Sequence, residues 1–358
     1  MIKKEIKSLT GIRGIAAIYV AVFHFYLHYT QSNSNNFLSK NSYLHSLLYH
    51  GYLGVDLFFI LSAFVITLTS SKYFEDKFEF KDYKNFMIKR WIRIYPTYAI
   101  ILIVTFFYSG QTHRVGNFLL SFSLLNSLFG LPYLVGHFWS LSTEWVTYMT
   151  YPILYRLFSA ARLLKWQLLI LIGILILYST CVLYYKEYAI QPFSFVINGG
   201  YYGLFRCFGD YFLGVFAFKI FSHYPKSKEI AGITSIVIIF ILICLLSFAK
   251  ADLLIVILFV ALILSLTNDN NVVSKLMSTK PIYILGLISY PLYLIHAILL
   301  YYLDYLKTLL SIFYGYNNFY LILMLLFLAL SVIFSYIFTF FIEKPIISFC
   351  NKKIHRVG

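Results

Sequence analysis

Long apolar segments alternate with short polar connections along almost the whole chain. A helix of roughly 20 apolar residues is long enough to cross a bilayer. We interpret ten segments as membrane spans, so the predicted fold is an all-α polytopic membrane helix bundle of about ten transmembrane helices. The predicted spans are residues 11–29, 53–71, 94–109, 137–158, 166–185, 200–221, 230–248, 252–267, 282–306 and 319–342.

The positions of the lysine and arginine residues predict how the spans are oriented. With the N-terminus inside, 22 of the 29 basic residues fall in inside segments and 5 in outside segments. Cytoplasmic loops carry such an excess, so both termini are predicted to be cytoplasmic. An eleventh span at residues 117–131 would invert every later loop, and we therefore expect a re-entrant or interfacial helix there. The polar segment 72–93 is expected to form an amphipathic cytoplasmic helix.

Composition supports a membrane protein and excludes several other classes. The chain is 60% hydrophobic, only 12% charged and has a mean hydropathy of +0.77. Its net charge of +15 comes from short loop clusters, so we predict no nucleic-acid partner. The four cysteines lack metal-ligand spacing, and no metal is expected. Residues 1–358 are predicted to form one integral-membrane domain without a soluble extension.

Two ionisable residues interrupt the first apolar segment. Arg13 and His24 are 11 residues apart, which places both on one helix face, separated by roughly 16 Å along the axis. Ionisable groups inside a membrane are costly and usually functional. We interpret Arg13 as a cation near the cytoplasmic surface and His24 as a base inside the bilayer. The alternative is a surface anchor together with a structural histidine.

A second basic motif begins the third span. Arg90 and Arg93 are three residues apart and therefore neighbours on one helix face. Guanidinium groups match phosphate oxygens in geometry, so Arg13, Arg90 and Arg93 could together hold a cytosolic polyphosphate. Simple snorkelling of the two motif arginines at the membrane surface is the alternative.

The fourth span begins with two further ionisable residues. His137 and Glu144 are seven residues apart on one helix face. Counted from opposite surfaces, Glu144 and His24 reach similar depths, and we expect them to meet. A carboxylate beside a histidine strengthens the base and selects its tautomer.

Several other polar residues are candidates for binding an acceptor. Asp56 lies near the outer end of the second span, where pairing with an arginine is the alternative. His296 faces the outer half of the ninth span, and Ser142 offers a hydroxyl that could instead bond its own backbone. Arg206 and Asp210 are spaced for a structural ion pair within one helix.

The motifs resemble those of the acyltransferase-three family of membrane O-acyltransferases. Arg13 and His24 resemble its R-x10-H motif, and Arg90 with Arg93 its R-x-x-R motif. The segments GVDLFFILSAFVIT, HFWSLSTEW, RCFGDYFLG and ISYPLYLIH also resemble family segments, in the family's order. Ala63 stands where glycine is usual and Trp145 where a second acid is common, which leaves Glu144 as the lone carboxylate there.

The resemblance implies transfer of an acyl group, usually acetyl, from coenzyme A to a carbohydrate hydroxyl in the bacterial inner membrane. Arg13, Arg90 and Arg93 would bind acetyl-CoA. His24 would be the general base, or alternatively carry the acyl group, with Glu144 assisting. Asp56, His137, Trp139, Ser142 and His296 would contact a sugar or glycolipid acceptor. The expected partners are this acceptor and membrane lipids, and a homo-oligomer is left open.

Two other functions are compatible with the same pattern. One is a transporter of a lipid-linked glycan or small molecule, which the lack of internal repeats disfavours. The other is a scaffold of a glycan-assembly complex, for which His24 would be dispensable.

Overall fold

All regular structure in the described part of the chain is helical, as predicted. The predicted span at residues 166–185 lies outside it. The computed structural model describes residues 5–32, 43–74, 78–108, 115–160, 200–223, 231–247, 251–268, 271–310 and 319–357.

The helices fall into two halves around the undescribed segment 161–199. The first half contains α1 (Lys7–Ser32), α2 (Tyr43–Tyr49), α3 (Gly54–Ser70), α4 (Phe80–Tyr108), α5 (Val115–Ser123), α6 (Asn126–Phe129) and α7 (Trp139–Ala160), with the short turns η1 (His50–Leu53), η2 (Ser71–Tyr73) and η4 (Gly136–Phe138). The second half contains α9 (Gly200–His223), α10 (Ala231–Leu245), α11 (Asp252–Leu266), α12 (Val272–Met277), α13 (Lys280–Leu287), α14 (Ser289–Tyr301), α15 (Leu303–Leu309), α16 (Phe319–Phe338), the π-helical turn η8 (Thr339–Glu343) and α17 (Lys344–Val357).

Four of the described helical stretches are long and apolar enough to cross a membrane, namely Lys7–Tyr29, Tyr43–Tyr73, Phe80–Phe107 and Phe319–Lys352. Helices α13 and α14 add a fifth if they are counted as one span bent by 67°. Helices α10 and α11 are apolar but shorter. The chain is thus a multi-pass helical protein, and the number of ten spans stays a prediction.

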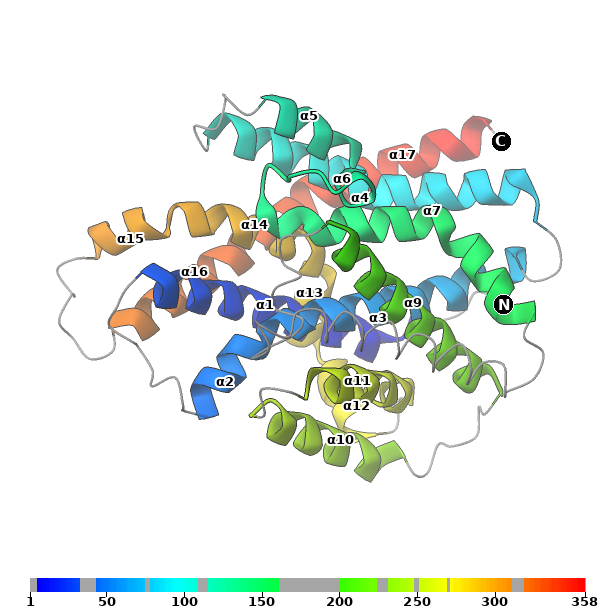
Figure 1. The fold of residues 1–358 in the computed structure, drawn as a ribbon, viewed down its shortest axis with the longest axis horizontal. Helices are drawn as coiled ribbons and strands as arrows, with labels where there is room; N and C mark the ends of the chain where they lie inside the picture. The colour runs from blue at the N-terminus through cyan, green and yellow to red at the C-terminus, as the bar shows by residue number, and fades with distance from the viewer. Residues whose placement is uncertain are drawn as a thin grey trace.

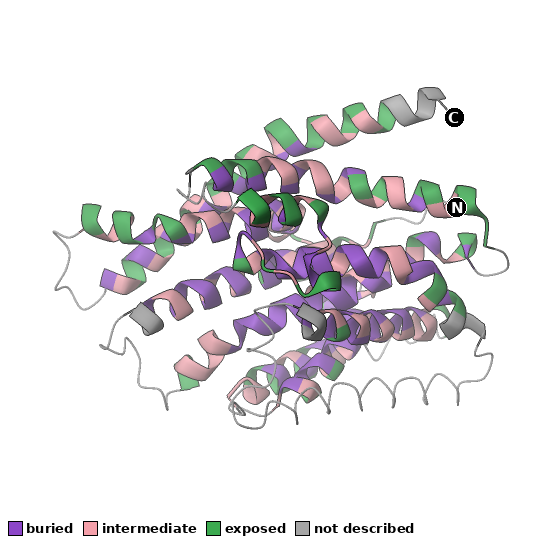
Figure 2. Ribbon diagram, turned by 45° about the horizontal axis from the view of Figure 1, so that its top comes forward, coloured by how far each residue is buried: buried purple, intermediate pink, exposed green. Residues whose placement is uncertain are grey.

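Helices α1 and α3 lie in the middle of the bundle (Figure 1). Most of their residues are buried, and Figure 2 shows buried residues concentrated on the central helices and exposed ones on the periphery. Helix α16 and its continuation are the opposite case, since only 22% of that apolar stretch is buried. An apolar surface of this kind is suited to contact lipid.

Two predicted boundaries need correction. Helix α4 runs without interruption through residue 93, so part of the predicted cytoplasmic helix and the third span form one helix. The change from polar to apolar residues marks where the surroundings of the helix change, and the helix does not end there. The predicted ninth span is divided into α13, α14 and α15. Pro291 cannot donate a hydrogen bond to the carbonyl of Leu287, which favours the bend between α13 and α14.

Glycines allow α1 and α13 to approach each other closely. A β-carbon built on Gly286 would overlap the backbone carbonyl of Thr10 in α1. One built on Gly14 would lie 2.5 Å from the backbone nitrogen of Gly286. Small residues at helix interfaces let backbones pack in this way inside a membrane. The contact sets the position of α1, which carries Arg13 and His24.

Replacement of Gly286 by alanine should therefore reduce the yield and melting temperature of the detergent-solubilised protein. The new methyl group meets backbone, which cannot move aside as a side chain can, and overpacking of this kind costs about 1–3 kcal/mol or more. Gly116→Ala is the matched control, because nothing lies within 4 Å of a β-carbon there. Equal melting temperatures for the two variants would contradict this account of the α1–α13 contact.

Candidate active site

Three histidines from distant parts of the chain meet inside the bundle. The Nδ1 atom of His24 on α1 lies 3.0 Å from Nε2 of His296 on α14. The ring of His137, on η4 before α7, stands edge-on to that of His24 with centroids 4.2 Å apart. Residues whose sequence numbers differ by more than 270 thus form one cluster, which we call the histidine cluster.

Hydrogen bonds within the histidine cluster select a tautomer of His24. Nδ1 of His296 lies 3.0 Å from the backbone carbonyl of Leu292, which can only accept, so Nδ1 carries the hydrogen. In the neutral imidazole Nε2 of His296 is then an acceptor, and Nδ1 of His24 must donate to it. This leaves a lone pair on Nε2 of His24. His24 is 7% exposed and His296 is fully buried. Of these two histidines, only His24 can therefore be reached by a reactant.

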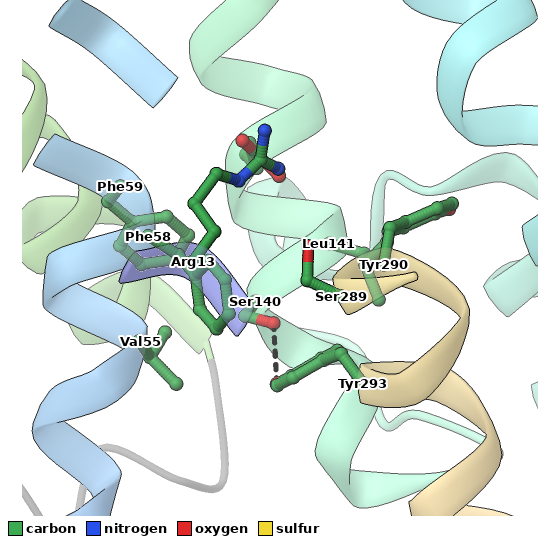
Figure 3. A pocket seen from close by; sticks show the side chains of 10 residues that line it. Arg13, Val55, Phe58, Phe59, Ser140, Leu141, Ser289, Tyr290 and Tyr293 are labelled. Atoms are coloured by element: carbon green, nitrogen blue, oxygen red, sulfur yellow. Dashed lines mark hydrogen bonds between the residues drawn. The ribbon is translucent and has the colours of Figure 1, made fainter. Parts of the chain in front are cut away.

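A pocket extends from Arg13, in the N-terminal half of α1, toward the histidine cluster. It encloses about 460 Å³ of empty space, including its opening. Figure 3 shows Arg13 reaching into it between side chains of α3 and α14. The lining residues are Arg13, Val55, Phe58, Phe59, Ser140, Leu141, Glu144, Ser289, Tyr290 and Tyr293.

The inner end of the pocket is coupled to the histidine cluster through Tyr293. Its hydroxyl lies 2.8 Å from Oγ of Ser140, a bond drawn in Figure 3. The same hydroxyl donates to the backbone carbonyl of His137 at 2.9 Å. Its ring centroid is 5.6 Å from that of His296. Tyr293 therefore lines the pocket and also contacts two residues of the histidine cluster, His137 and His296.

The other end of the pocket is a layer of charged and phenolic groups. Glu144 accepts hydrogen bonds from Tyr148 at 2.6 Å and from Tyr211 at 3.4 Å. Arg13 interacts electrostatically with Glu144 and with Arg93. The guanidinium of Arg90 lies 5.9 Å from the ring of Tyr148. The three predicted phosphate-binding arginines and Glu144 thus gather around one region.

Arg90 and Arg93 differ in their surroundings. Nε of Arg90 is buried without a hydrogen-bond partner, which leaves a donor available. Nη1 of Arg93 lies 3.3 Å from Oε1 of Glu343 in the π-helical turn η8. The side chain of Arg93 stays 43% exposed, so part of its donor fork can reach a ligand.

The expected contact between His24 and Glu144 is replaced by the pairing of His24 with His296. His137 lies on η4, before α7, at the level of His24, and Glu144 follows seven residues later, roughly 10 Å farther along the axis. That step brings Glu144 to the level reached by the long side chain of Arg13. The fourth span starts where it was predicted, at about residue 137, so the depth estimate failed because counting along two separate helices does not fix how they are shifted against each other.

Asp56 lies outside the residues that line the pocket. Its carboxylate accepts two hydrogen bonds from Arg206, at 2.7 Å from Nε and 2.5 Å from Nη2. Both side chains are almost completely buried. The pairing joins α3 to α9 and confirms the arginine-pairing alternative for Asp56.

Trp139 and Ser142, which were also predicted to contact the acceptor, contact other side chains and backbone of the protein. The guanidinium of Arg206 lies 5.7 Å from the ring of Trp139, which is buried. The hydroxyl of Ser142 bonds the backbone carbonyl of Leu124 at 3.0 Å and the amide of Ser127 at 2.9 Å. Ser142 thereby attaches α6 to α7.

Sequence reasoning missed the pocket residues of α14 and the acid in η8. Ser289 has a buried hydroxyl without a hydrogen-bond partner, and Tyr293 joins the pocket to the histidine cluster. Both lie in the segment ISYPLYLIH, where only His296 was singled out. Glu343 had no local pattern that would have distinguished it. Among the described residues, no group of three or more histidine, cysteine or acidic residues is arranged to hold a metal ion.

Comparisons with known proteins show the family to which the chain belongs. A family model described as "Acyltransferase domain" matches residues 6–339. The peptidoglycan O-acetyltransferase OatA of Listeria monocytogenes is 25% identical over 334 residues, covering 82% of this chain and 49% of OatA. The chain thus spans about half the length of that curated relative. No solved structure matches the chain. The match over nearly the whole sequence confirms the resemblance carried by the arginine and histidine motifs, and the chain belongs to the acyltransferase-three family of membrane O-acyltransferases.

Proposed function

We propose that this protein transfers an acyl group, most simply acetyl, from cytosolic acyl-CoA to a hydroxyl of a cell-surface carbohydrate such as O-antigen or exopolysaccharide. In this proposal the chain is a single domain in the bacterial inner membrane with ten spans and both termini in the cytoplasm. The observation that carries it is the pocket, which is lined by Arg13 at one end and at the other by Tyr293, which contacts the histidine cluster.

Arg13, Arg90 and Arg93, which we call the arginine layer, suit the phosphate groups of coenzyme A. Arg13 and Arg93 interact electrostatically with each other, and an anion between like charges relieves their repulsion. Nε of Arg90 is a buried donor without a partner. These groups would hold the phosphates at the cytoplasmic mouth, and the pocket would direct the pantetheine arm toward Tyr293.

The tautomer of His24 suits a general base. Its free Nε2 accepts the proton of the acceptor hydroxyl while the hydroxyl oxygen attacks the carbonyl carbon of the thioester. The carbon–sulfur bond then breaks, and the proton passes from His24 to the leaving thiolate. The products are the acylated sugar and free coenzyme A. Glu144 acts at a distance by holding the arginine layer together.

The acceptor would reach His24 from the side opposite the arginine layer. Of the predicted acceptor contacts, His137 is best placed, since its ring touches that of His24 and its Nδ1 is buried without a hydrogen-bond partner. His296 is proposed to act on His24 rather than on the sugar.

Mass spectra of surface glycans from the host, its gene deletion and the complemented deletion test the proposal. We expect a mass shift of one acyl group to be lost on deletion and restored by the wild-type gene. Glycans that keep their acyl groups but lose abundance or length would support the transporter or scaffold function instead.

Arg90→Gln should raise the KM for acyl-CoA by about 10–100-fold, because a charge-assisted hydrogen bond contributes about 1.5–3 kcal/mol. The measurement is acyl transfer from labelled acyl-CoA in inside-out membrane vesicles. Lys89→Gln is the matched control, since Lys89 is the preceding residue on α4 and is exposed. Equal KM values for the two variants would argue against Arg90 as a phosphate ligand.

A further inference from the structure

The helix that leaves the membrane last contains an unusual turn. Between α16 and α17, residues Thr339–Glu343 form the π-helical turn η8, in which the amide of Lys344 donates to the carbonyl of Thr339. Turns of this kind are rare and occur frequently at functional sites. Pro345 follows directly and cannot donate to the carbonyl of Phe341, which favours a wider turn at this point.

The π-helical turn places one acid inside the protein. The side chain of Glu343 is 1% exposed, whereas the neighbouring Phe341 is 72% exposed. Within the turn the two residues that face inward are Thr339 and Glu343. A carboxylate buried at the end of a largely lipid-facing helix is costly unless it is paired.

Glu343 is joined to the proposed donor site through Arg93. Oε1 of Glu343 lies 3.3 Å from Nη1 of Arg93. Glu343 also interacts electrostatically with Arg13 and with Tyr290, which lines the pocket. Tyr290 in turn donates to the carbonyl of Ile94, next to Arg93 on α4. The acid therefore lies beside two mutually repelling arginines at the pocket mouth.

The pairing uses only part of each partner. Glu343 bonds Arg93 through Oε1 alone and has Thr339 as a second hydrogen-bonding neighbour, while Arg93 keeps 43% of its side chain exposed. A pair built for stability alone would use both carboxylate oxygens, as Asp56 and Arg206 do. One oxygen is enough to orient the guanidinium and leave the remaining donors for a ligand.

We infer that Glu343 is a positioning residue for the acyl donor. It holds the guanidinium of Arg93 at the pocket mouth and offsets its repulsion from Arg13, so that both arginines are in place before the donor phosphates arrive. This inference rests on the proposed function, and it assigns to η8 the task of presenting Glu343 to α4.

The test is a double-mutant cycle on acyl transfer in inside-out vesicles, with variants Glu343→Gln, Arg93→Gln and the double variant. We expect Glu343→Gln to raise the KM for acyl-CoA about tenfold while kcat changes by less than about threefold. In the Arg93→Gln background the same substitution should leave KM unchanged, because its effect passes through Arg93. Glu343→Asp should recover part of the loss.

Glu5→Gln is the matched control, since Glu5 is an exposed acid that bonds Thr10 and Tyr283. A KM for Glu343→Gln that equals the control, or falls below it, overturns the inference, as does an effect of equal size in both backgrounds. If wild-type vesicles transfer nothing from acyl-CoA, the proposed function fails instead. Thermal melting of each purified variant separates a loss of folded protein from a change in KM.

Discussion

His24→Ala should lower acyl transfer by about 10²–10⁴-fold while the protein stays folded in the membrane, because this is the usual contribution of a positioned general base. The removed ring is small and lies beside other imidazoles, and the remaining core around α1 is apolar. The rate of acyl transfer from labelled acyl-CoA measures the effect. The number of acyl groups on surface glycans is a second measurement.

His28→Ala is the control for this substitution. His28 lies one turn farther along α1, where its ring is 3.5 Å from an exposed carboxylate of Asp304. We expect this variant to transfer at near wild-type rates. His296→Ala should fall between the two, since it keeps the base but removes the acceptor that selects the tautomer of His24. Retained activity in His24→Ala would refute the assignment of the base.

Asp56→Ala should lower the free energy of unfolding by about 3–5 kcal/mol, because it removes the carboxylate that accepts two hydrogen bonds from the buried guanidinium of Arg206. Unfolding of the purified protein in detergent, followed by heat or denaturant, measures the effect. The sequence had suggested that Asp56 contacts the acceptor. That role predicts a different outcome, in which Asp56→Ala stays stable and loses transfer.

The double variant Asp56→Leu with Arg206→Leu separates the two roles of Asp56. Replacing both members of a buried ion pair by apolar residues is often neutral or stabilising, so stability should largely return. Transfer should return with it if the pair only joins α3 to α9. A stable double variant without activity would instead place Asp56 or Arg206 in the acceptor site.

The main features of the site were readable from local spacing. Arg13 and His24 share one helix face because the helical period dictates it, and Arg90 and Arg93 are neighbours for the same reason. Membrane burial makes such groups conspicuous, because few structural roles justify their cost. The helical class and the membrane location followed from apolar length alone.

Contacts between distant helices were beyond that kind of reasoning. The partner of His24 is His296 and not Glu144, and the partner of Arg93 is Glu343, 250 residues away. Helical spacing fixes which residues share one face of a helix, but it does not fix how far a neighbouring helix is shifted along its axis, and a shift of one turn is enough to exchange one partner for another. Depth counted along a single helix cannot resolve such differences.

Sequence thus determines for this protein the apolar helices, the faces that carry its charges and the family to which it belongs. The helices and their charged faces depend on neighbours within a few turns of the same helix, and the family is shown by motifs in order along the chain. Tertiary structure decides which imidazole selects the tautomer of His24, where the pocket runs and what the π-helical turn presents to α4. Those properties depend on helix positions and rotations, which are set by close backbone contacts such as that between Gly286 and Thr10.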